Sequence, residues 1–424
     1  MKKFLALFLG MIALGSLHAQ GIKNSAAASP ESANFSSTRL TRIDHLLESY
    51  VNNEQLPGAV ALIVRDGKIV YHKAFGYADA ETKTPLKKDA IFRIASQTKA
   101  IASLAVMMLW EEGKFLLDEP LSKYIPEFKS PVILKTFNAT DSSYTTEPAK
   151  SEITIRQLLT HTSGIDYAAI GSTEFKAIYA KATVPSGIGN DKGVLAEKMK
   201  TLGKLPLKHQ PGERWTYGLN TDVLGYLVEV WSGLTFDQFL KTRIFDPLGM
   251  KDTYFYLPTD KHHRLVALHE NKNDKVIKRQ TKVYDGADPN YPLLEGKYFS
   301  GGAGLSSTVE DYAKFLQLFL NKGIYNGTRL LSRKTVELML TDQISETVSP
   351  GNEFGLGFGL ETERNDWQSV MSPGSFRWAG AFNTHYWADP KERLIGMVFT
   401  NVYSSPHWNI GEKFVNLTYQ SIAD

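Results

Sequence analysis

The hydrophobic and polar positions of the chain follow two different periods. Apolar residues recur at helical spacing over 38–52, which predicts a helix there. Residues 58–79 form two runs of β-forming residues separated by the pair Asp66-Gly67, the pattern of a β-hairpin. Residues 385–401 repeat this pattern around the turn "ADPKER". The final segment, from residue 409 onward, reads as a closing helix.

The region between the two hairpins has mostly helical patterns. One predicted helix lies within 153–164, after Thr154, and ends at Gly164. Two others are predicted over 220–233, with Asn220 or Asp222 as cap, and over 307–323, where Ser307 and Glu310 fit a capping box. We therefore predict an α+β fold, in which hairpins from both chain ends build an antiparallel sheet flanked by helices. A mostly helical subdomain would be inserted roughly over 115–300, and a ligand cleft is expected where the two parts meet.

Residues 92–114, "FRIASQTKAIASLAVMMLWEEGK", place Ser96 and Lys99 at the start of a very apolar helix. Residues three apart share a helix face, so the lysine amine can reach the serine hydroxyl. A serine hydroxyl needs a neighbouring base to become a nucleophile, and burial favours the neutral amine that can serve as one. Free N–H groups at the helix start are suited to stabilising an oxyanion. Chance alone predicts about one or two Ser-x-x-Lys matches in a chain of this length, so an incidental pair is the alternative.

Composition narrows the function classes. The chain has 424 residues, is 42% hydrophobic and carries a formal charge of +3. This weak charge gives no reason to expect nucleic acid or an anionic membrane as partner. The absence of cysteine excludes disulfides, thiolate metal sites and a cysteine nucleophile.

The first residues predict export. Lys2 and Lys3 precede an apolar run, and Ala19 offers a cleavage point, so residues 1–19 read as a signal peptide. The run is shorter than the ~20 residues of a membrane-spanning helix, which is the alternative. Residues 20–37 then read as a flexible polar linker, and 38–424 as the folded domain. We expect a periplasmic or secreted bacterial protein with no stable membrane anchor after cleavage.

Six segments, taken together, resemble a known superfamily. They are "FRIASQTK", "ITIRQLLTHTSG", "PGERWTYGLNTDVLGYLVE", "IFDPLGM", "GGAGLSSTVEDYAKF" and "WAGAFNTHYWADP". Over residues 40 to 420 the chain resembles the serine β-lactamases and penicillin-binding proteins, most closely the class C β-lactamase-like esterases and transesterases. The resemblance implies Ser96 as the acylated nucleophile, Lys99 as its activating partner and Tyr217 as the proton shuttle. It also implies an oxyanion hole formed by the N–H groups of Ser96 and Ala381.

Two motifs depart from the lactamase pattern. Trp378 stands where lactamases and peptidases have a cation that binds the substrate carboxylate, and an indole cannot do this. Leu219 stands where the Tyr-x-Asn motif has its asparagine. Both losses favour neutral esters over anionic amides. We expect Trp378, Gly380, Leu219 and Trp215 to contact the substrate. Arg377, next to Trp378 on the strand, should face away from the cleft.

Three hypotheses follow for the function. The first is an exported serine hydrolase that cleaves, or transfers acyl groups from, carboxylic esters through an acyl-enzyme on Ser96. The second is a β-lactamase or D-amino-acid peptidase acting on amides, and the third a catalytically silent protein that binds cell-wall peptides. The chemistry needs no metal or cofactor, the partner is a small-molecule ester or amide, and the oligomeric state is not predicted. His161 reads as a hydrogen-bonding loop residue, not as a base.

Overall fold

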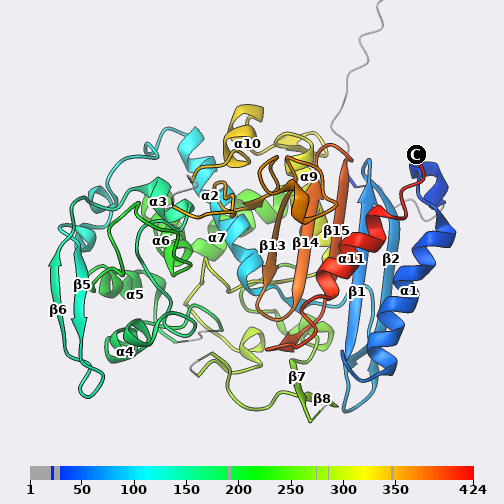
Figure 1. The fold of residues 1–424 in the computed structure, drawn as a ribbon, viewed down its shortest axis with the longest axis horizontal. Helices are drawn as coiled ribbons and strands as arrows, with labels where there is room; N and C mark the ends of the chain where they lie inside the picture. The colour runs from blue at the N-terminus through cyan, green and yellow to red at the C-terminus, as the bar shows by residue number, and fades with distance from the viewer. Residues whose placement is uncertain (1–20, 23–28, 190–191, 274, 285, 345–347) are drawn as a thin grey trace, which may run out of the picture.

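Both ends of the chain contribute strands to one antiparallel sheet (Figure 1). The computed structural model describes residues 21–22, 29–189, 192–273, 275–284, 286–344 and 348–424. The sheet has seven strands in the order β12-β13-β14-β15-β1-β2-β3. Their bounds are Gly359–Leu360 for β12, Phe376–Gly380 for β13, Thr384–Asp389 for β14, Leu394–Phe399 for β15, Gly58–Arg65 for β1, Lys68–Asp79 for β2 and Thr84–Pro85 for β3. The two predicted hairpins, β1–β2 and β14–β15, lie side by side through the pairing of β1 with β15.

Helices cover both faces of this sheet, which confirms the predicted α+β fold (Figure 1). The alternation of β1 assigns its residues to two cores: Ala61 and Ile63 pack with α1 (Ser37–Asn52) and α11 (Ile410–Tyr419), whereas Val60 and Leu62 belong to the larger core on the other side. That larger core contains α2 (Thr98–Glu111) and α9 (Val309–Leu320).

The inserted region, roughly 115–300, is mostly helical but also carries two small hairpins. Its helices are α3 Ile155–Leu159, α4 Thr173–Lys181, α5 Leu195–Leu202, α6 Asn220–Ser232, α7 Phe236–Leu240 and α8 Asp246–Leu248. Its hairpins are β5 (Val132–Phe137) with β6 (Tyr144–Pro148) and β7 (His269–Lys272) with β8 (Lys275–Lys278). Helix α6 packs against the buried helix α2, and this contact joins the helical region to the sheet.

The predicted linker needs a correction. Its residues 29–37 pack onto the domain: Pro30–Ala33 form a 3₁₀ turn, Phe35 is fully buried and pairs with Ile422, and Ser36 caps α1. The stretch is mostly polar, but its one large apolar residue, Phe35, is buried and holds the stretch on the domain. Residues 23–28 and the predicted signal peptide, 1–19, lie outside the described residues.

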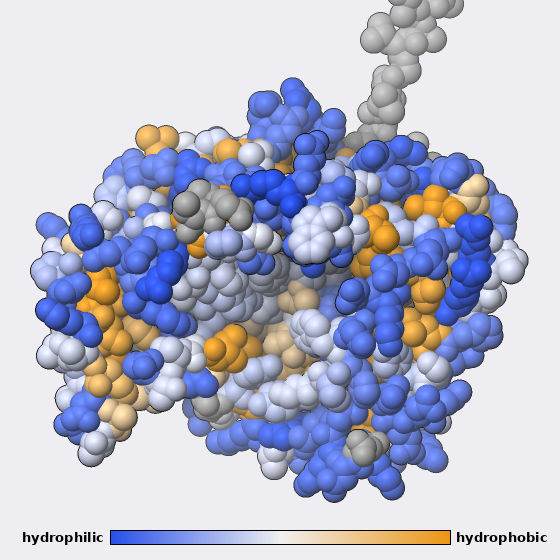
Figure 2. Space-filling view, in the orientation of Figure 1, coloured by the Kyte–Doolittle hydropathy of each residue, from blue (hydrophilic) through white to orange (hydrophobic). Residues whose placement is uncertain are grey.

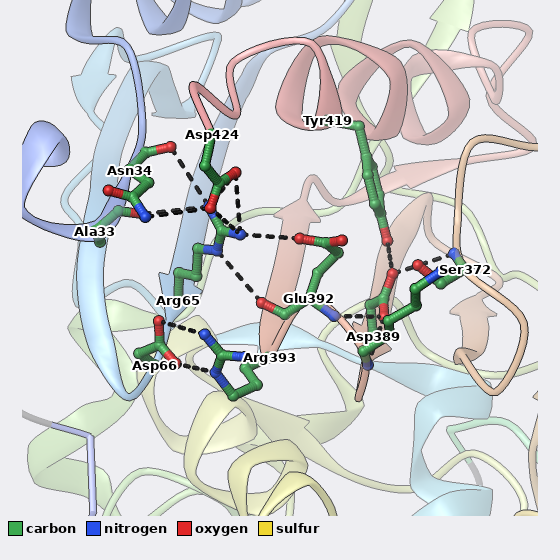
Figure 3. A network of polar contacts seen from close by, with 11 residues as sticks. Ala33, Asn34, Arg65, Asp66, Ser372, Asp389, Glu392, Arg393, Tyr419 and Asp424 are labelled. Atoms are coloured by element: carbon green, nitrogen blue, oxygen red, sulfur yellow. Dashed lines mark hydrogen bonds and ion pairs between the residues drawn. The ribbon is translucent and has the colours of Figure 1, made fainter.

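A buried arginine ties this segment to the other end of the chain (Figure 3). The guanidinium of Arg65 donates to the carbonyl oxygens of Ala33 and Asn34 at 3.4 Å. It also forms ion pairs with Glu392 at 2.9 Å and with Asp424 at 3.1 Å. The planar fork of an arginine suits this bridging of several acceptors. One side chain therefore holds residues from the chain start, the β14–β15 turn and the chain end together.

Several helix ends differ from the prediction. Thr154 caps α3 in a capping box with Gln157, as the pattern of Thr154 suggested, but the helix ends at Leu159 instead of continuing to Gly164. The cap of α9 is Thr308, which accepts from the N–H of Asp311, so the predicted box at Ser307 is one residue early. Local sequence offers two neighbouring hydroxyl residues here, and only tertiary packing selects between them.

Candidate active site

A strained turn presents Ser96. Strand β4 (Phe92–Arg93) leads into a 3₁₀ turn, Ala95–Gln97, which runs into α2. Ala95 has a φ of 43°, in the left-handed region that residues with a Cβ rarely adopt. Such a conformation costs on the order of 1–3 kcal/mol and persists only where the surrounding structure enforces it. Ala95 is fully buried. The packed core therefore forces the bend that places Ser96 at the start of α2.

The amine of Lys99 is the centre of the site. Lys99 is only 2% exposed. Its Nζ donates to the Ser96 Oγ at 3.3 Å, to the Tyr167 hydroxyl at 2.8 Å and to the carbonyl oxygen of Gly302 at 2.8 Å. A lysine ammonium has three protons to donate, and these three acceptors match them. The structure thus brings Ser96 and Lys99 into the contact that their spacing suggested.

Tyr217 approaches Lys99 through its ring. The Lys99 Nζ lies 4.4 Å from the centroid of the Tyr217 ring, within the range of a cation–π interaction. The ring also stacks on Trp215 at 5.7 Å and contacts Trp378 at 5.8 Å. Tyr217 lines the cleft and is half-buried. It lies beside Lys99 as expected, and its role as proton shuttle stays a prediction.

The phenol hydroxyl that accepts from Lys99 belongs to Tyr167, a residue that the sequence analysis missed. Tyr167 is 2% exposed, and its ring lies 5.2 Å from that of Tyr217. Burial raises the pKa of Tyr167 well above its usual value, and the neighbouring Tyr217 and Asp222 raise it further. Tyr167 is therefore a neutral phenol that can both accept and donate a proton. It follows the quoted "HTSG" by three residues, and that proximity was the available clue.

A carboxyl group faces the same site from α6. Asp222 is fully buried, and the Tyr298 hydroxyl donates to its Oδ1 at 3.1 Å. Burial raises the pKa of Asp222 to about 6, against the opposing effects of the Ser300 hydroxyl and the charge of Lys99. Asp222 does not cap α6, and neither does Asn220, because the N-cap position is Leu219, which makes no side-chain capping bond. The predicted capping role of these two residues is therefore wrong.

His161 is buried beneath Tyr217. Its ring lies 5.0 Å from the Tyr217 ring, and its Nδ1 lies 3.0 Å from the side-chain nitrogen of Asn220. Burial, and to a lesser extent the charge of Lys99, lowers the pKa of His161 well below its usual value. The neutral imidazole therefore packs against the Tyr217 ring and helps to fix its position.

The third motif lies on β13, next to the nucleophile turn. A Cβ at Gly380 would lie 2.3 Å from the carbonyl oxygen of Ile94, so the strand approaches this turn more closely than any other residue would allow. Ala381, the residue after Gly380, lines the same cleft as Ser96. The structure therefore brings both predicted oxyanion residues to one cavity.

The predicted substrate-binding residues do not all reach this cavity. Trp378 and Trp215 line it, and Trp378 also contacts Phe354 at 5.3 Å. The expectation for Leu219 is wrong: its side chain is fully buried against Gly187 and does not line the cleft. An apolar side chain at the motif's third position gains more from the core than from solvent. Gly380 contributes to the site through its backbone, because the absence of a Cβ lets β13 lie close to the turn that carries Ser96.

The cleft is large, and ten of the 32 residues that line it are phenylalanine, tyrosine or tryptophan. Its volume is about 970 Å³, and Figure 2 shows the surface hollowed at its centre. No group of three or more acidic, histidine or cysteine side chains suited to a metal occurs among the described residues. The same ranges contain no helix of the length and apolarity needed to cross a bilayer.

Comparison with known proteins identifies the family. The Beta-lactamase family matches residues 43–419. The chain belongs to the β-lactamase family. This confirms the resemblance noted in its motifs and makes the protein a serine hydrolase by family. Protein Rv1367c of Mycobacterium tuberculosis is 32% identical over 80% of this chain and 84% of its own length. Esterase EstB of Burkholderia gladioli is 30% identical over 85% and 90%, respectively.

Two solved structures share the fold of this chain. Simvastatin synthase (LovD) from Aspergillus terreus superposes with a TM-score of 0.75 at 25% identity, covering 91% of this chain and 98% of its own. EstCE1, described as a hydrolase with promiscuous acyltransferase activity, superposes with a TM-score of 0.77 at 24% identity, covering 90% and 98%. The likeness to EstCE1 bears on the fold alone.

Proposed function

We propose that the protein cleaves, or transfers acyl groups from, carboxylic esters through a covalent acyl-enzyme on Ser96. The observation that carries this proposal is the contact of the Lys99 Nζ with both the Ser96 Oγ and the Tyr167 hydroxyl, at 3.3 and 2.8 Å. A serine oxygen beside a buried amine, which is itself bonded to a phenol, has a route for its proton. This is the arrangement that activates a serine nucleophile.

The steps follow from these contacts. The Ser96 Oγ attacks the ester carbonyl carbon while its proton passes to the group formed by Lys99, Tyr167 and Tyr217. Coupled groups of this kind titrate as a unit, so the proton belongs to the group as a whole. The tetrahedral oxyanion is held by the N–H groups of Ser96 and Ala381. The C–O bond to the alcohol then breaks, the alcohol takes the proton, and water or a second alcohol releases the acyl group by the reverse sequence.

Esters are favoured by the wall that Trp378 forms. Its indole lines the cleft with Tyr217 and Phe354, and an aromatic wall accepts an uncharged substrate without an ion pair. The relative EstB is named an esterase, which supports the same substrate class. The second candidate, hydrolysis of β-lactams, has less support. Arg377, the cation next to Trp378, pairs in register with Trp387 on the α11 side of β13 and lies 3.9 Å from the Glu361 carboxylate, so it is not placed beside Ser96 to attract a substrate carboxylate.

Two measurements test the proposal. A fluorophosphonate should label the wild type on Ser96 and should not label Ser96→Ala; an unlabelled wild type would support the silent binding protein instead. Hydrolysis of short-chain p-nitrophenyl esters should then exceed hydrolysis of nitrocefin. Rapid nitrocefin turnover with negligible ester cleavage would favour the β-lactamase.

We also propose that the protein is exported to the periplasm or the medium. The support is the sequence alone: Lys2 and Lys3, the apolar run and Ala19. The mass of the protein purified from its natural host tests this. A mature chain beginning at Gln20 is expected, and an intact Met1 would refute cleavage.

A further inference from the structure

The cavity that contains Ser96 continues onto the other face of the sheet. Alternate residues of β13 point to opposite faces. Phe376 packs against Phe319 in the larger core, and Trp378, two residues on, turns toward Tyr217. Arg377 instead pairs in register with Trp387, whose ring packs on Phe414 of α11. Both Trp378 and Trp387 line the one cavity.

The open edge of β13 lets the cavity pass between the two faces. Strand β12 pairs only with Phe376 and Arg377 of β13, so no strand of the described sheet covers the edge from Trp378 onward. On the α11 side, the floor is formed by β13 and β14 and the walls by residues 367–371 and by the start of α11 with Trp408. We call this part of the cavity the outer groove. Figure 2, which views this face, shows the hollow beside α11.

Exposed apolar side chains concentrate around this cavity. Nine large hydrophobic residues of the described ranges are exposed, and four of them line the cavity: Ile170, Trp367, Val370 and Trp408. Three of these four belong to the outer groove, with exposures of 82% for Trp367, 50% for Val370 and 46% for Trp408. Single exposed apolar residues need no explanation, but their gathering along one cleft marks a binding surface.

The groove also has a fixed aromatic wall. The Trp408 ring meets the His385 ring edge-on at 4.7 Å, and His385 is itself held by Asn383 at 2.7 Å. Gly411, the second residue of α11, lets the helix approach His385, because a Cβ there would lie 2.4 Å from the His385 Nδ1. Trp408 is therefore anchored on one edge while its remaining surface faces solvent. A preformed aromatic surface binds a flat apolar group at low entropic cost.

We propose that the outer groove binds a large apolar group of the ester substrate, such as a fused ring system or a long chain, on the side of β13 away from Ser96. The proposal rests on the proposed esterase function and names its substrate class. A cleft of about 970 Å³ is at the upper end of the ~300–1,000 Å³ typical of sites for drug-sized ligands. A short-chain ester would fill little of it. The continuity of the groove with the catalytic cavity identifies the occupant as part of the same molecule.

Kinetics on paired substrates test this. For Trp408→Ala, KM for p-nitrophenyl 2-naphthoate or 2-naphthyl acetate should rise at least tenfold, while kcat and KM for p-nitrophenyl acetate stay within twofold. Testing both bulky esters covers an apolar group on the acyl side or on the alcohol side. Leu116→Ala is the matched control, because Leu116 is 66% exposed and does not line the cavity. Equal kinetics of Trp408→Ala and wild type on both bulky esters would overturn the proposal.

A binding measurement separates this proposal from the esterase function. 2-Naphthol titrated into Ser96→Ala and into the Ser96→Ala, Trp408→Ala double variant needs no catalysis. Weaker binding by at least fivefold in the double variant supports the groove, even if no ester is cleaved by the wild type. Ester cleavage with unchanged naphthol binding in the double variant would leave the esterase function standing and refute the groove.

Discussion

The close contact of Gly380 with the nucleophile turn predicts what an added methyl group would do. In Gly380→Ala the new Cβ would lie 2.3 Å from the carbonyl oxygen of Ile94 and 2.3 Å from the Thr384 Oγ1. Real Cβ contacts are at least 3.0 Å, so β13 and the turn must separate by about 0.7 Å or more. The Ile94 carbonyl also accepts from the N–H of Gln97 at 3.1 Å. The displacement therefore acts directly on the turn that carries Ser96.

The expected loss is catalytic more than structural. Oxyanion donors act within about 2.7–3.1 Å, and a misplacement near 1 Å costs about 10²-fold. We expect kcat for p-nitrophenyl acetate to fall at least ~10²-fold in Gly380→Ala. Overpacking should lower the free energy of unfolding by about 1–3 kcal/mol. Stopped-flow or steady-state kinetics, together with urea unfolding, measure the two effects separately.

Gly58→Ala provides the matched control. Its Cβ would lie 2.6 Å from the carbonyl oxygen of Phe75, a comparable backbone clash in the same sheet but on β1, three strands away from β13. This variant should lose stability and keep kcat within threefold of wild type. If Gly380→Ala folds and also keeps kcat within threefold, the assignment of the Ala381 N–H to the oxyanion hole is refuted.

The site and its surroundings give four further predictions. Lys99→Ala and Tyr217→Phe should each lower kcat at least ~10²-fold without unfolding, because each removes a positioned proton-transfer group; near-wild-type kinetics would refute the role concerned. Tyr167→Phe should lower kcat at least tenfold, since the Lys99 Nζ loses its 2.8 Å acceptor; an unchanged kcat would make that contact incidental. Asp222→Asn removes the negative charge facing Lys99, so the kcat/KM profile should move to lower pH, and an unmoved profile would assign Asp222 a structural role only. The free energy of unfolding should fall as the pH drops from 7 to 5, because burial lowers the pKa of His72, His269 and His385 to about 4, whereas histidines of the unfolded chain take up protons near pH 6.5. Replacing one of these histidines with glutamine should make the free energy of unfolding depend less on pH. Urea titration at both pH values measures this.

Features set by neighbouring residues could be predicted from the sequence. The hairpins follow from alternation and the Asp66-Gly67 turn, and they occur at 58–79 and 384–399 in the structure. The contact of Ser96 with Lys99 depends on a spacing of three residues on one turn. Phe35 and Leu219 were misassigned because nothing local reveals which buried surface an apolar side chain will meet. Their environments are formed by residues hundreds of positions away or by another loop, Ile422 for Phe35 and Gly187 for Leu219.

The second tyrosine shows why the site could not be completed from motifs. Tyr167 is 68 residues from Lys99, and no periodicity relates the two; the loop before α4 must fold back onto α2 before they meet. The family motifs predict one tyrosine beside Lys99, whereas in the structure two tyrosines contact Lys99 in different ways. Tyr167 accepts from the amine, and Tyr217 presents its ring face at 4.4 Å. Tyr217 also interacts with Tyr167 through a side-chain hydrogen bond and a ring contact at 5.2 Å, so the amine and the two phenols form one connected group. The Tyr167→Phe and Tyr217→Phe variants therefore test two members of the same group, and we expect both to lower kcat.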